Sequence, residues 1–171
     1  MPAQTNQPLA DAASDIFLHV QTRRAGKIKG EGTTDGHRDD IGVHGWSWGV
    51  DANTAIGSSA STARRSYRQL VVTKSIDSAS TGLLSALVTN DEVREATLAM
   101  RKAGGEALDY FRMTLHGARV VNVEIDVGAD GRPLERVSFA FTTIDIEYKR
   151  QQGTGSGSGS MTFHDEAIPA G

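Results

Sequence analysis

Hydrophobic and polar residues alternate with a period of two through most of the chain after residue 14. The segment DIFLHVQ places Ile16, Leu18 and Val20 at every second position, which predicts a strand with one buried face. Two further segments show this pattern, with the apolar sets Phe111, Met113 and Leu115, and Val121, Val123, Ile125 and Val127. The GADGRP segment that follows (128–133) contains Asp-Gly and Pro, which favour a hairpin between antiparallel strands.

Two predicted strands change phase partway along their length. In residues 41–50 the apolar positions shift from Ile41 and Val43 to Trp46, Trp48 and Val50, and residues 137–148 shift in the same way after Phe141. A change of phase requires a bulge, or a strand whose two ends are buried on different faces. Bent strands of this kind curl a sheet into a barrel or form the corner of a sandwich, so we predict a mainly β protein.

One segment departs from the β pattern. Residues 77–91, DSASTGLLSALVTND, predict a short helix with Ser80 or Thr81 as its N-cap and Asn90 near its end. Its apolar residues share one helical stripe, formed by Leu83, Leu84, Leu87 and Val88. A helix of this length is not stable alone, so we expect it to pack on the β structure.

Length and composition exclude several classes of protein. The 171 residues suit one domain with a substantial core. A net charge of −3 argues against a general nucleic-acid-binding protein, which usually has a strong basic excess. The absence of cysteine excludes disulfides and thiolate chemistry. No stretch approaches the roughly 20 apolar residues that a membrane-spanning helix needs.

The ends of the chain and two internal segments differ in composition from the rest. The first fourteen residues lack the basic start and apolar run of a cleaved secretory signal, so secretion would use another route. We expect residues 1–14 to be a flexible extension and residues 15–168 to form a single domain. Within it, the small-residue loop 53–66 and the Gly-Ser segment 153–160 should be flexible, and the MTFHDEAI segment predicts one last strand.

Both tryptophans lie in the segment HGWSWG (44–49). On a strand, Trp46 and Trp48 point to the same side, and we expect them to anchor the core. Ser47 then faces outward between Gly45 and Gly49, which leaves a surface of small side chains. An aromatic platform for a sugar or another ligand is the alternative interpretation.

Several polar residues have the types that metal sites and active sites use. His37, Asp39, Asp40 and His44 are common metal ligands, but their spacing matches no familiar arrangement, and a polar loop followed by a strand explains them better. Ser47, His44 and Asp51 contain the residue types of a hydrolase triad without the G-x-S-x-G turn. We therefore expect no catalytic residue, no cofactor and no metal site.

Charged segments suggest contacts rather than chemistry. The RKAGGE segment (101–106) lacks the order of residues in a phosphate-binding loop and predicts a tight turn. The basic residues form two runs, Arg23, Arg24, Lys27 and Lys29, and Arg64, Arg65 and Arg68. Surface charge or partner contact explains them better than phosphate binding. The acidic pairs Asp39-Asp40 and Asp91-Glu92 would complement them if copies associated head to tail.

Five segments in this order resemble one known family. They are DIFLHVQ, the Ile-x-Val stretch leading into WSWG, TKSID (73–77), RKAGGE (101–106) and VSFAFTTIDIEY (137–148). Together they resemble the haemolysin-coregulated protein (Hcp) family, the tube protein of bacterial type VI secretion systems, over residues 15 to 168. The sequence departs from the family pattern in its N-terminal extension, in the Ser/Ala/Thr-rich composition of loop 53–66 and in its repetitive Gly-Ser segment.

The resemblance implies an antiparallel β-barrel of two sheets with one short flanking α-helix, and no catalytic residue. It further implies a homohexameric ring that stacks into a tube inside a contractile sheath, next to spike proteins. Such a tube assembles in the cytoplasm, is secreted through the apparatus without a cleaved signal peptide, and carries effector proteins in its lumen. Nucleic acid and membrane insertion have no part in this function.

On this resemblance we expect Ser47 to line the lumen and the mobile loop to contact the next ring. The residues expected in that contact are Ile56, Gly57, Ser58, Ser59, Ala60, Ser61, Arg64 and Arg65. Two rival interpretations remain: a monomeric small-ligand-binding β-barrel with Trp46 and Trp48 lining its cavity, and a metal hydrolase that uses His37, Asp39 and His44.

Overall fold

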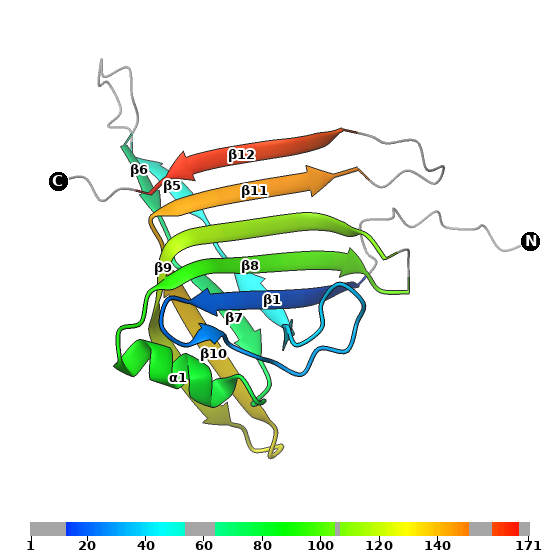
Figure 1. Ribbon diagram of the computed structural model, residues 1–171, viewed down its shortest axis with the longest axis vertical. Coiled ribbons are helices and arrows are strands. Elements are labelled where there is room, and N and C mark those ends of the chain that lie inside the picture. Colours follow the sequence, from blue (N-terminus) through cyan, green and yellow to red (C-terminus); the bar gives the residue numbers. More distant parts are fainter. Residues whose placement is uncertain (1–12, 54–63, 105–106, 151–158, 168–171) are drawn as a thin grey trace, which may run out of the picture.

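The computed structural model describes residues 13–53, 64–104, 107–150 and 159–167 (Figure 1). Its elements, in chain order, are β1 (Ser14–Thr22), β2 (Gly26–Lys27), β3 (Ile41–Val43), β4 (Gly45–Ser47), β5 (Val50–Asn53), β6 (Arg64–Tyr67), β7 (Leu70–Lys74), α1 (Ser80–Val88), β8 (Val93–Lys102), β9 (Asp109–Val127), β10 (Pro133–Ala140), β11 (Thr143–Lys149) and β12 (Ser160–Glu166). The prediction of a mainly β protein with one short helix is confirmed. The predicted hairpin at 128–133 and the predicted last strand are also present.

The strands form two sheets around one core and a separate two-stranded arm. In sheet A, β2 and β3 pair with β1, and the order continues through β8, the first half of β9, β11 and β12. In sheet B, the order is the second half of β9, then β10, β7 and β4. The arm consists of β5 and β6. All of these pairings are antiparallel.

The long strand β9 belongs to both sheets. Its first half lies between β8 and β11, and its second half, from Arg119 onward, pairs with β10. The bend between the halves lies at Gly117, whose φ of +55° is a left-handed conformation that disfavours residues with a side chain. The strands β10 and β11, which pair with the two halves of β9, are joined by a bend at residues 141–142, opposite Gly117. The hairpin of β9 with β10–β11 therefore folds over from one sheet into the other.

The chain also crosses between the sheets at residues 41–47. Ile41–Val43 pair with β1 in sheet A, whereas Gly45–Ser47 pair with β7 in sheet B. Both phase changes seen in the sequence thus occur where the chain leaves one sheet and enters the other, which confirms that the ends of these segments are buried on different faces. Among the described strands, the hydrogen-bonded strands do not close into a continuous barrel. The gap lies between β3 in sheet A and β4 in sheet B, which are connected only through the backbone at His44.

The core between the sheets follows the predicted alternation with one exception. Leu18, Val20, Met113 and Leu115 are fully buried, together with residues of β7 and β10 in sheet B and of α1. The predicted apolar face at 121–127 is wrong at Val121, Ile125 and Val127, which are 41–63% exposed. A register shift opposite residues 138 and 139 leaves Val121 without a partner, and the tip of the β9–β10 hairpin runs past the helix (Figure 1).

The helix packs on the β structure as predicted, but with a different face. Leu83 and Ala86 are buried, whereas Leu84 and Val88 of the predicted stripe are 38% and 78% exposed. The N-cap is Ala79 rather than Ser80 or Thr81. The Ser80 hydroxyl does not cap the helix because it forms hydrogen bonds with the buried side chains of Lys74 and Glu135. These hydrogen bonds turn the helix toward sheet B.

A buried ion pair holds the start of the helix. Lys74 and Glu135 lie opposite each other on β7 and β10, both with no exposed surface, and their Nζ and Oε2 atoms are 2.8 Å apart. The Ser80 hydroxyl donates to Glu135 at 2.6 Å, and Asp77 accepts from Lys74 at 2.8 Å. Because a buried charge is stable only when it is paired and hydrogen-bonded, these contacts fix the position of α1 on sheet B.

The strands extend into three segments that were predicted to be flexible, and four of the predicted boundaries differ. Ser14, assigned to the N-terminal extension, begins β1, and its hydroxyl is 2.5 Å from that of Tyr110. The ends of the predicted loop 53–66 are strands: Asn53 closes β5, and residues 64–66 belong to β6. Ser160, assigned to the Gly-Ser segment, begins β12. In the part of the chain that the structure describes, no helix has the length and apolar character needed to cross a bilayer.

Replacing Gly117 should test the bend. A Cβ on Gly117 would lie 2.3 Å from the Thr142 hydroxyl, and its positive φ adds strain. We expect Gly117→Ala to lower the free energy of unfolding by about 1–3 kcal/mol, measured by urea denaturation. Gly131→Ala is the matched control, because Gly131 has a φ of +73° and a Cβ added there would meet no atom within 4 Å. Equal losses in the two variants would show that the crossing at Gly117 needs no close approach.

Candidate functional site

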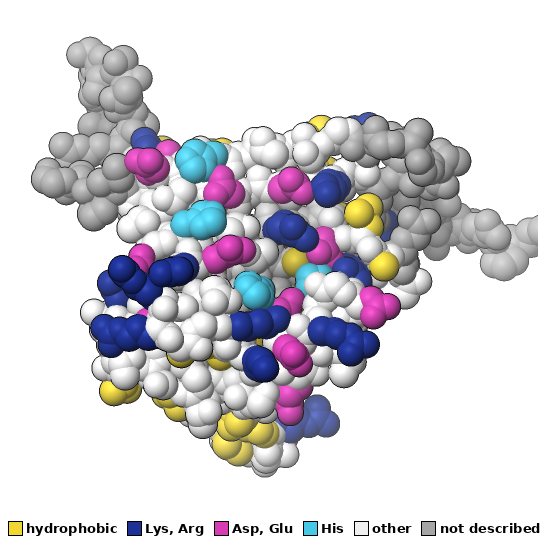
Figure 2. Space-filling model, viewed as in Figure 1, with side chains coloured by type: hydrophobic (Ala, Val, Ile, Leu, Met, Phe, Trp, Pro, Cys, Tyr) yellow, Lys and Arg dark blue, Asp and Glu magenta, His cyan; other side chains and the backbone are white. Residues whose placement is uncertain are grey.

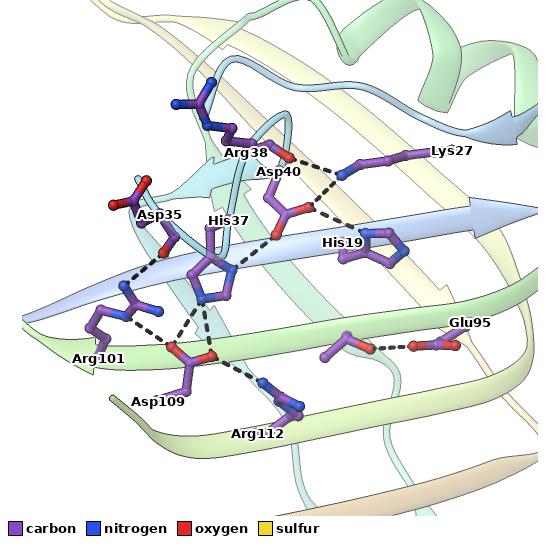
Figure 3. Close-up of polar contacts among 11 residues, drawn as sticks. His19, Lys27, Asp35, His37, Arg38, Asp40, Glu95, Arg101, Asp109 and Arg112 are labelled. Carbon is purple, nitrogen blue, oxygen red and sulfur yellow. Dashed lines mark hydrogen bonds and ion pairs between the residues drawn. The ribbon is translucent and has the colours of Figure 1, made fainter. Parts of the chain in front are cut away.

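The most connected polar cluster lies where loop 28–40 crosses the outer face of sheet A (Figure 3). His37 is at its centre and is 6% exposed. Its imidazole ring stacks flat on Phe17 of β1, with ring centroids 4.1 Å apart and planes within 5°. The Arg101 guanidinium of β8 lies 5.8 Å from the same phenyl ring. The stacked histidine therefore holds this part of the loop against the sheet, in addition to the buried side chain of Ile28 at the start of the loop.

Both ring nitrogens of His37 face carboxylates. Nδ1 is 2.9 Å from Asp40 Oδ2, and Nε2 is 2.9 and 3.0 Å from the two oxygens of Asp109. Ionised carboxylates only accept hydrogen bonds, so each nitrogen needs a hydrogen to satisfy this geometry. The imidazole ring of His37 thus bridges β9 to the loop through the two carboxylates.

Cationic groups surround the two acids on their other sides. Asp109 accepts from Arg101 Nε at 3.0 Å and from Arg112 Nη2 at 3.1 Å. Asp40 is 3.0 Å from Lys27 Nζ and 3.2 Å from His19 Nδ1. Positive and negative groups alternate through the cluster, which connects loop 28–40 with β1, β2, β8 and β9.

The balance of burial and hydrogen bonding decides the ionisation of the two acids. Burial raises the pKa of Asp40, but hydrogen bonds from His37, Lys27 and His19 outweigh it and hold that pKa below its ordinary value. Burial likewise raises the pKa of Asp109, and hydrogen bonds from His37, Arg101 and Arg112 outweigh it. Both carboxylates are therefore charged at neutral pH, which is the form that the cluster requires.

The loop folds tightly enough to bring His37 inward because two residues permit close contact. A Cβ on Gly32 would lie 2.4 Å from the His37 carbonyl oxygen, so only glycine fits there. Asp39 takes a left-handed conformation with φ of 61°, which Asp tolerates better than most residues. Backbone hydrogen bonds from Gly32 to Asp40 and from Asp39 to Gly32 close the turn.

A cleft of about 280 Å³ opens beside the cluster on the outer face of sheet A. Its polar lining includes His19, Asp40, Glu95, Thr97, Arg112 and Thr114. A second cleft of about 620 Å³ runs along β1, β3 and the segment 75–77. Neither cleft is lined by a tryptophan, so neither supports the rival interpretation of an apolar cavity lined by Trp46 and Trp48.

The candidate metal and hydrolase residues are not brought together. Among the residues that the structure describes, no three His, Cys, Asp or Glu side chains are placed to hold a metal ion, which contradicts the interpretation with His37, Asp39 and His44. His37 is occupied by Asp40 and Asp109, while His44 bonds the Ser75 hydroxyl at 2.6 Å. Asp51, from the alternative triad, pairs with Arg68.

The two tryptophans pack at the rim of the core and remain half-buried. Trp46 stacks on Phe111 at 5.6 Å and donates its indole N–H to the sulfur of Met100. Trp48 follows the end of β4 and stacks on Tyr67 at 6.0 Å. The Trp48 indole N–H is buried and has no partner among the described residues. These contacts agree with an anchoring role that links β4 to sheet A and to the arm.

Ser47 is exposed on the outer face of sheet B. Across the four strands of this sheet its row continues through Val71, Ser138 and Asn122, which are opposite one another in register. The next row contains Gly45, Thr73, Arg136 and Glu124. Most of these side chains are small or uncharged. Figure 2 shows the opposite face of the molecule, over sheet A, where charged side chains and histidines gather.

The residues of the expected ring-stacking loop are only partly described. Ile56, Gly57, Ser58, Ser59, Ala60 and Ser61 lie outside the described residues. Arg64 and Arg65 lie in β6 rather than in a loop, because residues 64–67 pair with β5. The Arg65 side chain reaches β12, where its Nε is 2.6 Å from Asp165.

Several of the acidic residues that were expected to pair with a neighbouring copy are paired within their own chain instead. Asp91 is 4% exposed and accepts from the backbone N–H groups of Arg24 and Ala25. Glu92 pairs with Arg23 at 3.5 Å, and Asp40 is buried in the His37 cluster. These acids are thus engaged by the basic segment of their own chain, so they are not free patches for a neighbouring copy.

Sequence reasoning missed Phe17, Arg101, Asp109 and Arg112. A signal existed for two of them, because Arg101 and Asp109 flank the predicted turn at RKAGGE and are opposite each other in register. Opposite charges on either side of a turn commonly pair across a hairpin. Nothing in the sequence pattern placed them next to His37, which lies 72 residues away from Asp109.

The comparisons with known proteins agree on one family. The family model described as "Type VI secretion system effector, Hcp" matches residues 17–148. Protein Hcp1 of Pseudomonas aeruginosa is 29% identical over 151 residues, covering 86% of this chain and 90% of that protein. The crystal structure of Hcp1 from Salmonella typhimurium is 27% identical, with a TM-score of 0.71 over 91% of this chain and 96% of that one. The Hcp1 structure from E. coli EAEC 042 shares the fold, with a TM-score of 0.74 at 21% identity over 90% and 99% of the two chains.

Removing the His37 imidazole should leave two buried carboxylates without their shared partner. We expect His37→Gln to lower the free energy of unfolding by about 3–5 kcal/mol, measured by urea denaturation at pH 7. His44→Gln is the control, since that exposed histidine bonds only a serine hydroxyl in the described structure, and should change it by less than about 0.5 kcal/mol. Because the pKa values of Asp40 and Asp109 lie below the ordinary 3.8, their contribution is complete above that pH and is lost as the pH falls through the folded values. As the pH is lowered, the free energy of unfolding of His37→Gln should therefore fall less steeply than that of the wild type. An equal dependence on pH in the two proteins would contradict the role of His37 as the shared partner of Asp40 and Asp109.

Proposed function

Because the chain belongs to the Hcp family of type VI secretion proteins, we propose that it is a structural component of the secretion tube. In this proposal six copies close into a ring, rings stack into a tube inside the contractile sheath, and the lumen carries effector proteins. The tube assembles in the cytoplasm, meets spike proteins at its end and is secreted through the apparatus. The observation that carries the proposal is the arrangement of sheet B, whose two edges are unpaired among the described strands and whose outer face has mostly small or uncharged side chains.

The free edges of sheet B supply two different surfaces for association. Among the described strands, β4 pairs only with β7, and residues 119–127 of β9 pair only with β10. Unpaired edges attract strands of other chains unless they are covered. Two unlike surfaces on one subunit support a heterologous contact, which produces a ring when the rotation between copies closes.

The outer face of sheet B suits the lumen of such a ring. One row across it contains the small or uncharged side chains of Ser47, Val71, Ser138 and Asn122, and Gly45 has no side chain. A wall of this kind offers cargo few charged or large apolar groups, so contacts with an effector would be weak and reversible. On this basis Ser47 is assigned to the lumen.

The arm formed by β5 and β6 suits contact between rings. It projects from the body of the subunit, on the side where β12 ends (Figure 1). The residues between its strands include Ile56, Gly57, Ser58, Ser59, Ala60 and Ser61. In the proposal the arm reaches the neighbouring ring in the stack, and Arg64 and Arg65 lie at the end of β6 that adjoins these residues.

The mass of the protein in solution tests the ring. Six copies of the 18.2 kDa chain amount to roughly 109 kDa, and light scattering on a size-exclusion column should report that mass. Electron micrographs of the same fraction should show annular particles. A single species near 18.2 kDa would instead favour the alternative of a monomeric small-ligand-binding barrel and would overturn the proposal.

Enlarging Ser47 should obstruct cargo without breaking the ring. We expect Ser47→Gln to reduce the amount of effector that co-purifies by about tenfold, which corresponds to about 1.4 kcal/mol of lost affinity, while the mass of the assembly stays constant. Thr162→Gln is the control, because Thr162 is an exposed residue of β12 in sheet A. Unchanged cargo retention in Ser47→Gln rings would remove Ser47 from the lumen.

A further inference from the structure

The arm needs contacts at its base to hold a fixed direction. It is a separate two-stranded sheet, and an isolated two-stranded hairpin is at best marginally stable in water. Within the arm, Arg68 forms two hydrogen bonds with Asp51, at 2.9 and 3.1 Å. This pair joins the two strands at the base of the arm to each other. It does not fix the angle between the arm and the rest of the subunit.

An aromatic cluster joins the arm to the body. The Tyr67 ring of β6 stacks on Trp48 at 6.0 Å and meets Phe141 edge-on at 5.9 Å. Such contacts stabilise the packing of the rings beyond burial alone, but they tolerate sliding and rotation. They bring the arm to the body without fixing its direction.

One carboxylate on β12 makes the directional contacts. Asp165 accepts a hydrogen bond from the Tyr67 hydroxyl and one from Arg65 Nη2 at 3.0 Å, and Arg65 Nε lies 2.6 Å from its other oxygen. Arg65 and Tyr67 are two residues apart on β6, so both side chains project from the same face of the arm. The hydrogen bond from Tyr67 lowers the pKa of Asp165, and Arg65 adds to this effect, so the carboxylate remains charged at neutral pH.

The position of Asp165 breaks the pattern of its own strand. On β12 the alternate residues Met161 and Phe163 are opposite Tyr148 and Ile146, and Asp165 is opposite Ile144, which is fully buried. The register therefore predicts an apolar residue at 165. Asp165 shares this face with Met161 and Phe163, which are 61% and 46% exposed, and its own side chain is 21% exposed. A partly buried carboxylate beside apolar side chains is stabilised by specific partners, and the arm supplies two.

We propose that Asp165 is the positioning residue that fixes the direction of the β5–β6 arm, so that the last strand of the chain controls contact between rings. The contact between rings rests on the proposed function; the fixing of the arm does not. Strand β12 pairs only with β11 among the described strands. Anything that loosens this edge strand would therefore release the arm, while sheet B and its free edges would be unaffected.

Hydrogen exchange on the full-length protein tests the fixing of the arm. In Asp165→Asn, the amides of residues 50–53 and 64–67 should exchange about tenfold faster than in the wild type, while those of β8 stay unchanged. Asp145→Asn is the matched control, since Asp145 is a carboxylate on the adjacent strand that pairs with His116 and His164 rather than with the arm. Unchanged exchange in the arm of Asp165→Asn would overturn the proposal.

A charge exchange separates the ion pair from general damage to β12. Arg65→Asp alone should loosen the arm, and the double variant Arg65→Asp with Asp165→Arg should restore most of its protection, because the pair is re-formed with its polarity reversed. Tyr67→Phe, which removes only the hydroxyl, should give an intermediate effect. Equal loosening in the double variant and in Arg65→Asp would also overturn the proposal.

Tube length in electron micrographs tests the consequence for stacking. Deleting residues 57–63 should leave rings intact and shorten tubes, and Asp165→Asn should do the same. If the deletion has no effect on tubes, the arm does not connect rings and that part of the proposed function fails. If the deletion shortens tubes and Asp165→Asn does not, the control by β12 alone is overturned.

Discussion

The chain crosses between the sheets at residues 41–47 and at the hairpin where β9 pairs with β10 and β11, and the position of the other elements depends on these two crossings. Side chains alternate strictly along a strand, so a segment that passes from one sheet to another around the same core must reverse its inward face. At 41–47 the reversal takes one residue, His44, and at the bend of β9 it occurs at Gly117. Once both crossings are fixed, the order of strands in each sheet follows from the connections.

Buried charges place the elements that lie outside the sheets. Apolar contact alone does not fix orientation, because the hydrophobic effect has no direction, whereas a hydrogen-bonded ion pair has a defined geometry. Loop 28–40 is oriented by His37 between Asp40 and Asp109, and α1 by Ser80 on the pair of Lys74 and Glu135. The same principle applies to the arm, whose directional contacts are made by Asp165.

The alternation of residues predicted several strands and the phase changes at 41–50 and 137–148, because burial on one face acts locally on every residue, but it did not predict the bend of β9 at Gly117. It did not predict which polar residues meet, since Asp109 reaches His37 only through the stacking of loop 28–40 on sheet A. The helix shows the same limit. Its spacing allowed a stripe with Leu84 and Val88, but the Ser80 hydroxyl rotates it toward Glu135, a partner 55 residues away that periodicity cannot reveal.

The two outer faces of the molecule differ in a way that bears on the proposed tube. On sheet A, exposed charged side chains are paired within the chain, as Lys149 is with Glu147 and His164 with Asp145, and exposed pairs of this kind contribute little to binding unless a partner desolvates them. On sheet B, the row from Ser47 to Asn122 exposes few groups that bind tightly. A carrier must hold its cargo during export and release it afterwards, so it needs many weak contacts rather than a few strong ones. Sheet B meets that requirement better than sheet A, which is why the lumen is assigned to it.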